Sequence, residues 1–279
     1  MASVIDVPAW DDPRLAGYRG VNDPQGLEQQ GRCIIEGRLV VPRLVALTRA
    51  PGRWQGCLES VLVTPSAWAR MAPIMGDTSD LVVYRLEAEQ WQALTGFHLH
   101  RGCLALAQRP EVPSLETVVP GAVPHVVVLE RVSNPDNIGG IFRSAAALGA
   151  DLLVLGPGCG DPLYRKAIRT SMGASLEVPY VIAADVPRAL QWLQSRGYCV
   201  AALTTPPADC SLPDWLPPDQ PTALLAGAEG EGLSDAARSV SDLTVSIPMT
   251  GRVDSLNVTT AISIALYHAG WTRHRDIAN

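Results

Sequence analysis

Short apolar runs alternate with longer amphipathic runs along most of the chain. Runs rich in β-branched residues predict strands, and runs with apolar residues three and four apart predict helices. In the first half the strand-like runs span 32–37, 58–64, 80–86 and 101–108, and the helix-like runs span 39–47, 66–75 and 87–97. This order predicts a small α/β domain. Pro42 weakens the first of these helices, because proline interrupts a helix interior.

The second half repeats the alternation, and its strand-like runs are almost continuously apolar. HVVVLERV from His125, DLLVLG from Asp151 and TALLAGA from Thr222 show this pattern. Such strands are typical of a parallel sheet that is covered by helices on both faces. Open parallel sheets bind ligands in loops beyond the carboxyl ends of their strands. The residues that follow each strand are therefore the candidates for a site.

Prolines separate the two halves. Four prolines from Pro110 to Pro124 fall in a stretch with little apolar periodicity, which is typical of a linker. We therefore predict an N-terminal domain at 1–109, a linker at 110–123 and a C-terminal domain at 124–279.

The composition is that of an ordinary globular protein. Hydrophobic residues make up 47% and charged residues 18% of the 279 residues, with a net charge of −6. Residues 1–110 carry 11 basic and 11 acidic side chains, whereas the remainder carries 11 and 17. The negative charge argues against binding of nucleic acid by bulk electrostatics. No stretch resembles a signal peptide or reaches the roughly 18 apolar residues of a membrane span, so we expect a cytoplasmic protein.

The six cysteines show no metal-binding or disulfide pattern. They are scattered along the chain, without a C-x-x-C pair and without a histidine at ligand spacing. This distribution predicts neither a zinc site nor a disulfide framework. We expect no bound metal, and we expect the cysteines to be buried free thiols.

Three loops of the second half carry residues suited to chemistry. In the first, SNPDNIGGIFRSAAALGA, Asn134 follows a strand, Gly139 and Gly140 open a helix, and Arg143 lies one turn inside it. Glycines at a helix start permit close approach of a ligand or of another backbone. Arginine offers five donors to an anion. An ordinary strand-to-helix turn with a surface arginine explains the same residues equally well.

The second loop, LLAGAEGEGLS, is rich in glycine. It lacks both the spacing of the dinucleotide fingerprint and the G-K-[ST] of a phosphate-binding P-loop. Its acids Glu229 and Glu231 suit a ligand with positive charge better than a phosphate. A Gly-rich turn with an acid at a helix N-terminus explains the segment equally well.

The third loop, SIPMTGRVDSLNVTTAISIALYH, leads from a strand into the last helix. The strand ends near Met249, and Asp254 or Ser255 is the expected cap of the helix. Ser255 and Asn257 stand where they could cap the helix, line a ligand site, or do both.

In this order, the three loops resemble motifs 1, 2 and 3 of the SpoU, or TrmH, branch of the SPOUT methyltransferases. The matching residues are Asn134, Gly139 and Arg143 for the first motif, Gly227, Glu229, Gly232 and Leu233 for the second, and Ile247, Pro248, Met249, Ser255, Leu256 and Asn257 for the third. The first half is similar, through Glu36, Gly37 and FHLHRGCLALA, to the ribosomal-protein-like substrate-binding domain of many members. The resemblance therefore covers nearly the whole chain.

The resemblance implies a C-terminal α/β domain with a mostly parallel sheet and a deep trefoil knot, preceded by a smaller α/β domain. It implies S-adenosylmethionine as the cofactor and transfer of its methyl group to a ribose 2′-hydroxyl of RNA. The residues expected to hold the cofactor are Leu225, Ala226, Gly227, Gly232, Ile247, Met249, Ser255 and Leu256.

The resemblance also implies a set of catalytic residues: Arg143, Asn134, Glu229, Ser255 and Asn257. A guanidinium stays protonated in proteins. We therefore expect Arg143 to stabilise the developing oxyanion rather than to act as a base. The other four residues would orient Arg143 and the ribose.

The resemblance also implies partners. The residues expected to contact RNA are Arg32, Arg38, Arg143 and Arg169. Five arginines between Arg32 and Arg53 form a candidate docking surface, although a solvated face would show the same pattern. Members are homodimers through the knot region, so a homodimer is expected. The two-domain plan favours ribosomal RNA over tRNA.

Other functions compete with this prediction. A dehydrogenase-like nucleotide-binding enzyme would share the α/β pattern, but the glycine spacing counts against it. Three further candidates share the fold: a tRNA ribose methyltransferase, a base methyltransferase and a non-catalytic RNA-binding homologue. Cofactor binding without methylation of any RNA would identify the non-catalytic homologue.

Overall fold

The computed structural model describes residues 3–75, 79–96, 102–118, 125–215 and 221–277, with side chains of the last helix described as far as Gly270. The chain forms two compact units. Met1–Glu111 and Leu163–Leu176 make up unit 1, and Val112–Pro162 and Glu177–Asn279 make up unit 2.

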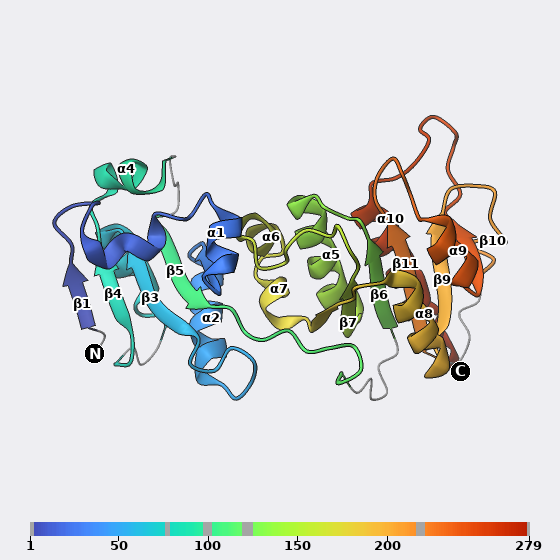
Figure 1. Ribbon diagram of the computed structural model, residues 1–279, viewed down its shortest axis with the longest axis horizontal. Coiled ribbons are helices and arrows are strands. Elements are labelled where there is room, and N and C mark those ends of the chain that lie inside the picture. The colour runs from blue at the N-terminus through green and yellow to red at the C-terminus, as the bar shows by residue number, and fades with distance from the viewer. Residues whose placement is uncertain (1–2, 76–78, 97–101, 119–124, 216–220, 278–279) are drawn as a thin grey trace. The chain divides into compact units, whose positions relative to one another are not determined.

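Unit 1 contains a five-stranded mixed sheet with the order β1-β4-β3-β5-β2 (Figure 1). Its strands are β1 (Ser3–Asp6), β2 (Arg32–Glu36), β3 (Leu58–Val63), β4 (Val82–Arg85) and β5 (Cys103–Gln108). Strands β1, β4 and β3 run parallel to one another, and β5 is antiparallel to both β3 and β2. This sheet confirms the α/β class of the first half and contains all four predicted strands.

Helices pack around this sheet. They are η1 (Pro13–Tyr18), α1 (Pro24–Gln29), α2 (Val40–Arg49), α3 (Pro65–Met71), η2 (Ala88–Gln90), α4 (Trp91–Thr95), α6 (Arg165–Thr170) and α7 (Ala174–Glu177). Pro42 is the third residue of α2. The first four N–H groups of a helix have no partner within the helix, so this proline interrupts no hydrogen bond.

The segment Leu163–Leu176 joins unit 1 although it lies far along the chain. The indole Nε1 of Trp54, a buried side chain, donates to the Leu176 carbonyl at 2.6 Å. Arg53 donates to the same carbonyl at 2.8 Å. The buried carboxylate of Glu36 accepts a hydrogen bond from Arg165. The segment lies within the predicted C-terminal range 124–279, but it packs with the first half of the chain. Its assignment therefore differs from the predicted domain ranges.

Unit 2 contains a seven-stranded sheet with the order β10-β12-β9-β11-β6-β7-β8, in which every pair is parallel. Its strands are β6 (His125–Glu130), β7 (Leu152–Leu155), β8 (Tyr180–Ile182), β9 (Cys199–Thr204), β10 (Cys210–Ser211), β11 (Thr222–Gly227) and β12 (Leu243–Ser246). The mostly parallel sheet predicted for the second half is confirmed.

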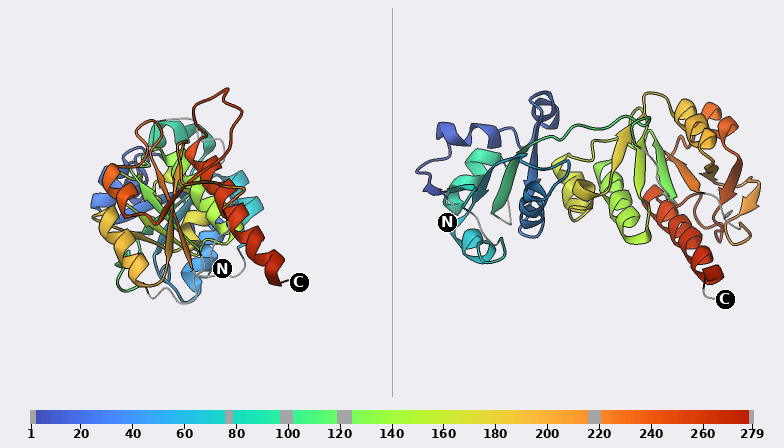
Figure 2. Two further views of the ribbon diagram at one scale, coloured as in Figure 1. Left: turned by 90° about the vertical axis from the view of Figure 1, so that its right-hand side faces the viewer. Right: turned by 90° about the horizontal axis from the view of Figure 1, so that it is seen from below.

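Helices cover both faces of this sheet. They are α5 (Pro135–Leu148), α8 (Val186–Ser195), α9 (Asp235–Val240) and α10 (Val258–Ile277). Figure 2 shows α5 and α10 on one face and α8 and α9 on the other. No helix in the described ranges, α10 included, is long and apolar enough to cross a membrane. Leu115 of the predicted linker is buried in the core of unit 2, so this stretch packs against the sheet.

The chain turns back between β12 and α10. Strand β12 lies beyond β9 in the sheet, yet α10 packs against α5 and β11. The connecting residues 247–257 must therefore return past the ends of β9 and β11. The trefoil knot itself stays a prediction.

All six cysteines are free thiols. Cys33, Cys103 and Cys199 are buried as expected, whereas the other three are partly exposed. Burial raises the pKa of the Cys103 and Cys159 thiols, so both stay protonated at neutral pH. Among the described residues, no group of three or more His, Cys, Asp and Glu side chains is placed to hold a metal ion.

Candidate active site

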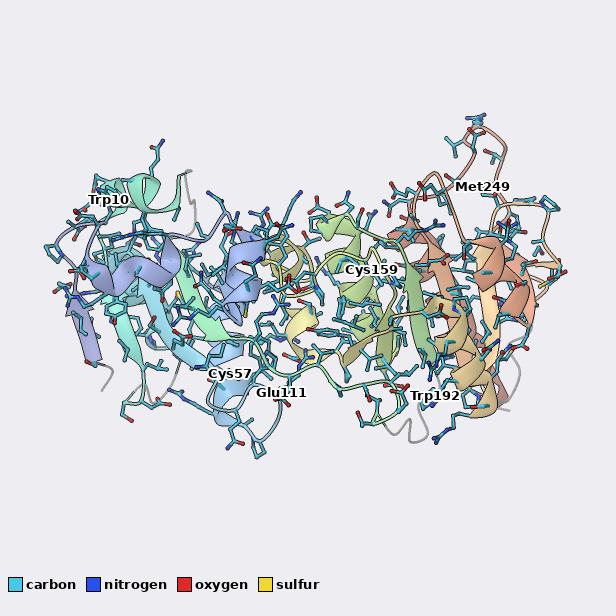
Figure 3. The ribbon with its side chains drawn as sticks, viewed as in Figure 1. Trp10, Cys57, Glu111, Cys159, Trp192 and Met249 are labelled. Atoms are coloured by element: carbon cyan, nitrogen blue, oxygen red, sulfur yellow. The ribbon has the colours of Figure 1, made fainter. Side chains whose placement is uncertain are left out.

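A cavity of about 560 Å³ lies at the carboxyl ends of β9, β11 and β12. Its lining residues come from three segments: Leu203, Thr204 and Thr205; Ala226 to Leu233 with Arg238; and Val245, Ile247, Met249, Asp254, Ser255, Leu256, Val258 and Ala261. Figure 3 labels Met249 on the loop that follows β12. Seven of the eight residues predicted to hold a cofactor belong to this lining. Leu225 does not, because its side chain is buried in the core of the sheet.

Glycines let the second loop fold back on the end of β11. Gly232 N–H donates to the Ala228 carbonyl at 3.0 Å. A Cβ on Gly227 would lie 2.4 Å from the Gly232 carbonyl oxygen, a distance that backbone atoms cannot accommodate. Gly230 and Gly232 have φ values of 87° and 67°, which side chains other than glycine rarely adopt. These glycines therefore serve the shape of the loop.

Arg131 lies outside the residues that match the three motifs, and it holds this loop in place. It follows β6 directly and donates to the Gly232 carbonyl at 3.2 Å. Its guanidinium also lies 3.2 Å from the Glu231 carboxylate. Neighbouring Glu130 accepts hydrogen bonds from the N–H and the hydroxyl of Ser234, both at 2.7 Å. The end of β6 thus fixes the C-terminal side of the turn that carries Glu229.

Three polar side chains from the three loops meet beside the cavity. Asn257 Nδ2 donates to Glu229 Oε1 at 2.6 Å and to Asn137 Oδ1 at 2.9 Å. Asn137 Nδ2 donates to the same Glu229 oxygen at 3.1 Å. We call these three residues the amide–carboxylate network. The carboxylate accepts two charge-assisted hydrogen bonds, and its second oxygen, Oε2, forms no hydrogen bond with the described residues.

Helices α5 and α10 pack closely behind this network. A Cβ on Gly140 would lie 2.7 Å from Thr259 Cγ2. One turn further along α5, the Ser144 hydroxyl accepts a hydrogen bond from Ser263 at 2.7 Å. The Thr259 hydroxyl donates to the Asn137 carbonyl at 3.2 Å. The small residues of the first loop thus bring the start of α10 against α5.

Asn137, and not Asn134, supplies the amide of the first loop. Asn134 is the N-cap of α5, where its Oδ1 accepts a hydrogen bond from the Asp136 N–H at 2.8 Å. Asn137 is the third residue of the helix and is buried. The sequence signal was a polar residue among the apolar positions Ile138 and Ile141, on the side of the helix that faces the core.

The cap of α10 also differs from the prediction. The helix begins at Val258, and Asn257 caps it, because its Oδ1 accepts a hydrogen bond from Thr259 N–H at 2.9 Å. Neither Asp254 nor Ser255 caps the helix. Ser255 is exposed and lines the cavity. Asn257 therefore caps the helix through its side-chain oxygen and donates to the other two members of the network through its side-chain nitrogen.

Arg143 is exposed on α5 and forms no hydrogen bond or ion pair with the described part of the chain. It lies beside Gly140 and Ser144, the residues that contact α10. It does not line the cavity. Its guanidinium is available to a group that approaches from solvent.

The other arginines predicted to contact RNA have different surroundings. Arg32 forms two hydrogen bonds with Glu59, both at 2.8 Å. Arg169 lies 3.7 Å from the buried carboxylate of Glu36. Arg38 is partly exposed. Arg43, Arg49 and Arg53 each donate to carbonyl oxygens within unit 1. The structure thus uses most of this cluster for internal contacts.

The comparisons with known proteins agree on one family. Residues 124–267 match the model of the SpoU rRNA methylase family. An uncharacterised tRNA/rRNA methyltransferase of Mycobacterium bovis is 41% identical over 279 residues, which cover 97% of this chain and 93% of that protein. The chain belongs to the SpoU rRNA methylase family.

Two further relatives have more specific names. The 23S rRNA (guanosine-2′-O-)-methyltransferase of Ralstonia nicotianae is 33% identical over 194 residues, which cover 68% of this chain and 76% of that methyltransferase. The crystal structure of the SpoU methyltransferase AviRb from Streptomyces viridochromogenes, in complex with S-adenosylmethionine, has a TM-score of 0.77 at 26% identity. It covers 95% of this chain and 100% of that chain. The predicted family, α/β fold and S-adenosylmethionine cofactor are confirmed.

The cavity of this SpoU protein suits S-adenosylmethionine. Its volume lies within the usual range of small-molecule sites. Ile247, Met249 and Leu256 offer apolar surface, and the folded-back glycine loop exposes backbone groups to hydrogen-bond a purine and a ribose. The acids Glu229 and Asp254 favour a ligand that carries positive charge, as a sulfonium does.

We predict that replacing the two asparagines of the first loop has different effects on catalysis. Asn137→Ala removes one donor from Glu229 and one acceptor from Asn257, and we expect kcat for RNA methylation to fall at least about ten-fold. Asn134→Ala removes only a cap and is expected to cost about 1 kcal/mol of stability, with kcat retained. Steady-state kinetics measures kcat for both variants, and binding of S-adenosylhomocysteine is the control for an intact cofactor site. Equal kcat values for the two variants would contradict the assignment.

Proposed function

We propose that this SpoU methylase transfers the methyl group of S-adenosylmethionine to a ribose 2′-hydroxyl of ribosomal RNA. The observation that carries the proposal is the amide–carboxylate network at the mouth of the cavity, with the exposed Arg143 on the adjoining helix. The 2′-O-methyltransferase named above, which acts on 23S rRNA, supports the ribose and the ribosomal substrate.

The bound cofactor supplies an activated methyl group on a positively charged sulfur. The protein's part is to place a ribose against that methyl group and to stabilise the oxygen as its proton leaves. Placing two reactants in line accounts for a large share of such a rate enhancement. The Glu229 carboxylate is held rigidly by its two amide donors, so its second oxygen, Oε2, is in position to accept a hydrogen bond from the ribose or to face the sulfonium.

Arg143 stabilises the developing oxyanion. Its guanidinium is permanently charged, so it acts as a donor and the hydroxyl proton passes to the neighbouring RNA phosphate or to water. A donor directed at the charge that develops in the transition state is worth about 10²- to 10³-fold in rate. The side chain has no internal partner in the described structure, and approach of the RNA therefore breaks no existing ion pair.

We infer that residues 1–109, together with the segment 163–176 that packs with them, form the RNA substrate-binding domain. Residues 110–123 connect the two domains, and the rest of 124–279 forms the methyltransferase domain. Arg38 and Arg143 are the predicted RNA contacts with the greatest freedom to reach a phosphate. Arg32 and Arg169 would bind RNA only as members of ion pairs. Because the proposed substrate is ribosomal RNA, we place the reaction in the cytoplasm.

We propose that the active form is a homodimer through α10. Ile264 and Tyr267 lie on one side of this helix and are 38% and 58% exposed, and neighbouring exposed apolar side chains are typical of a protein interface. Ile264→Glu is expected to shift sedimentation from dimer to monomer, whereas Gln191→Glu, at an exposed position of α8 on the other face of the sheet, is expected to leave it unchanged. A wild-type protein that sediments as a monomer would refute the dimer.

The proposed reaction is tested by the position of the transferred methyl group. The protein is incubated with tritiated S-adenosylmethionine and unmodified ribosomal RNA or tRNA, and the RNA is digested to nucleosides. We expect a labelled 2′-O-methylnucleoside from ribosomal RNA. Arg143→Ala should lower the rate at least about 10²-fold with cofactor affinity retained. A labelled base, or wild-type turnover by Arg143→Ala, would contradict the mechanism. Label in tRNA alone would show that tRNA, and not ribosomal RNA, is the substrate.

A further inference from the structure

Two charged side chains of the cavity lining have no partner among the described residues. Glu229 is engaged by the amide–carboxylate network, and Glu231 lies against Arg131. Arg238 and Asp254 also line the cavity and are exposed. Neither forms a hydrogen bond or an ion pair through its side chain with any residue in the described ranges. One positive and one negative group are therefore free to meet charges on a ligand.

Arg238 is the basic residue among the described residues that line the cavity. It lies in α9, the short helix that begins directly after the glycine loop and is capped by Ser234. Its backbone N–H donates to the Ser234 carbonyl at 3.0 Å, and Ser234 is bound in turn by Glu130. The same anchor that fixes the loop around Glu229 therefore fixes the base of the Arg238 side chain.

The charges of S-adenosylmethionine explain why an acidic cavity keeps one arginine. The cofactor carries a sulfonium, an α-ammonium and a single anionic group, the α-carboxylate. The acids Glu229, Glu231 and Asp254 favour the two cations and disfavour the carboxylate. A carboxylate placed here needs a cationic donor, and a guanidinium binds a carboxylate through two parallel hydrogen bonds.

We propose that Arg238 binds the α-carboxylate of S-adenosylmethionine and thereby selects ligands that carry the complete amino-acid group. The proposal rests on the cofactor assignment and extends it to a residue outside the three motifs. The contact lies away from the reacting methyl group. Arg238 is thus a cofactor-binding residue that acts on affinity and selectivity rather than on the chemical step.

The test compares two ligands that differ in the amino-acid group. S-adenosylhomocysteine carries the carboxylate, whereas 5′-methylthioadenosine keeps the adenosine and the thioether but lacks the amino-acid group. Dissociation constants are measured by titration calorimetry for the wild type and for Arg238→Gln. We expect the variant to bind S-adenosylhomocysteine about ten-fold more weakly, which is the lower end for a hydrogen bond between charged groups, and to bind 5′-methylthioadenosine as the wild type does.

Arg188→Gln is the matched control, because Arg188 is exposed on α8 of the same unit and does not line the cavity. This variant should bind both ligands as the wild type does. Equal weakening of both ligands in Arg238→Gln would overturn the proposal and indicate contact with the adenosine or a disturbed fold. Unchanged affinity for both ligands would also overturn it, and reduced RNA affinity would then indicate a phosphate contact.

Failure of this proposal is distinguishable from failure of the proposed function. Ligand binding requires no RNA and no turnover. A wild type that methylates ribosomal RNA, paired with an Arg238→Gln variant of unchanged ligand selectivity, would leave the function intact and remove the role of Arg238. A wild type that binds S-adenosylhomocysteine but labels no RNA, paired with an Arg238→Gln variant of changed ligand selectivity, would remove the proposed function and keep the role of Arg238.

Discussion

The amide–carboxylate network is the interaction on which the active site depends. In the sequence, 92 residues separate Asn137 from Glu229, and 28 residues separate Glu229 from Asn257. Only the fold brings these side chains together. Asn257 donates to both of the others while its oxygen caps α10. One side chain therefore couples the start of the last helix to the loop that holds the cofactor cavity. Hydrogen bonds to a charged group are among the stronger polar contacts in proteins.

Parallel strands explain why such residues can meet. Strands β6, β11, β9 and β12 are neighbours in one parallel sheet, so their carboxyl ends share an edge. The loops that leave β11 and β12 both border the cavity, and the loop after β6 supplies Arg131 and α5. Close packing at this edge requires small residues. Gly227 lies against the Gly232 carbonyl, and Gly140 lies against Thr259.

The sequence predicted the elements better than the contacts. Short, nearly continuous apolar runs identified most strands of the two sheets, because a strand buried on both faces is apolar along its whole length. Strand β1 was missed because its short exposed run carries little of that signal, and β10 was missed because it has only two residues. The motifs located Glu229, Asn257 and the two loops that border the cavity, but they assigned the first-loop amide to Asn134. Local sequence cannot separate a capping asparagine from one that faces a distant loop three residues later.

Long-range contacts account for the other differences. Leu163–Leu176 follows a strand of unit 2 in sequence, yet Trp54 and Glu36 bind it into unit 1. Arg32, Arg53 and Arg169 are basic positions in the sequence, but internal acceptors engage them in the fold. A charge pattern shows which side chains are basic and cannot show which of them are already paired.

The close approach of two backbone segments at Gly227 shapes the cofactor cavity. Titration calorimetry of S-adenosylhomocysteine with Gly227→Ala tests it most directly, with Gly270→Ala as the control, because a Cβ there meets nothing closer than 3.9 Å. Gly227→Ala should lose at least about ten-fold in affinity, since the added methyl group displaces backbone at the cavity wall. Wild-type affinity in a folded Gly227→Ala protein would contradict it.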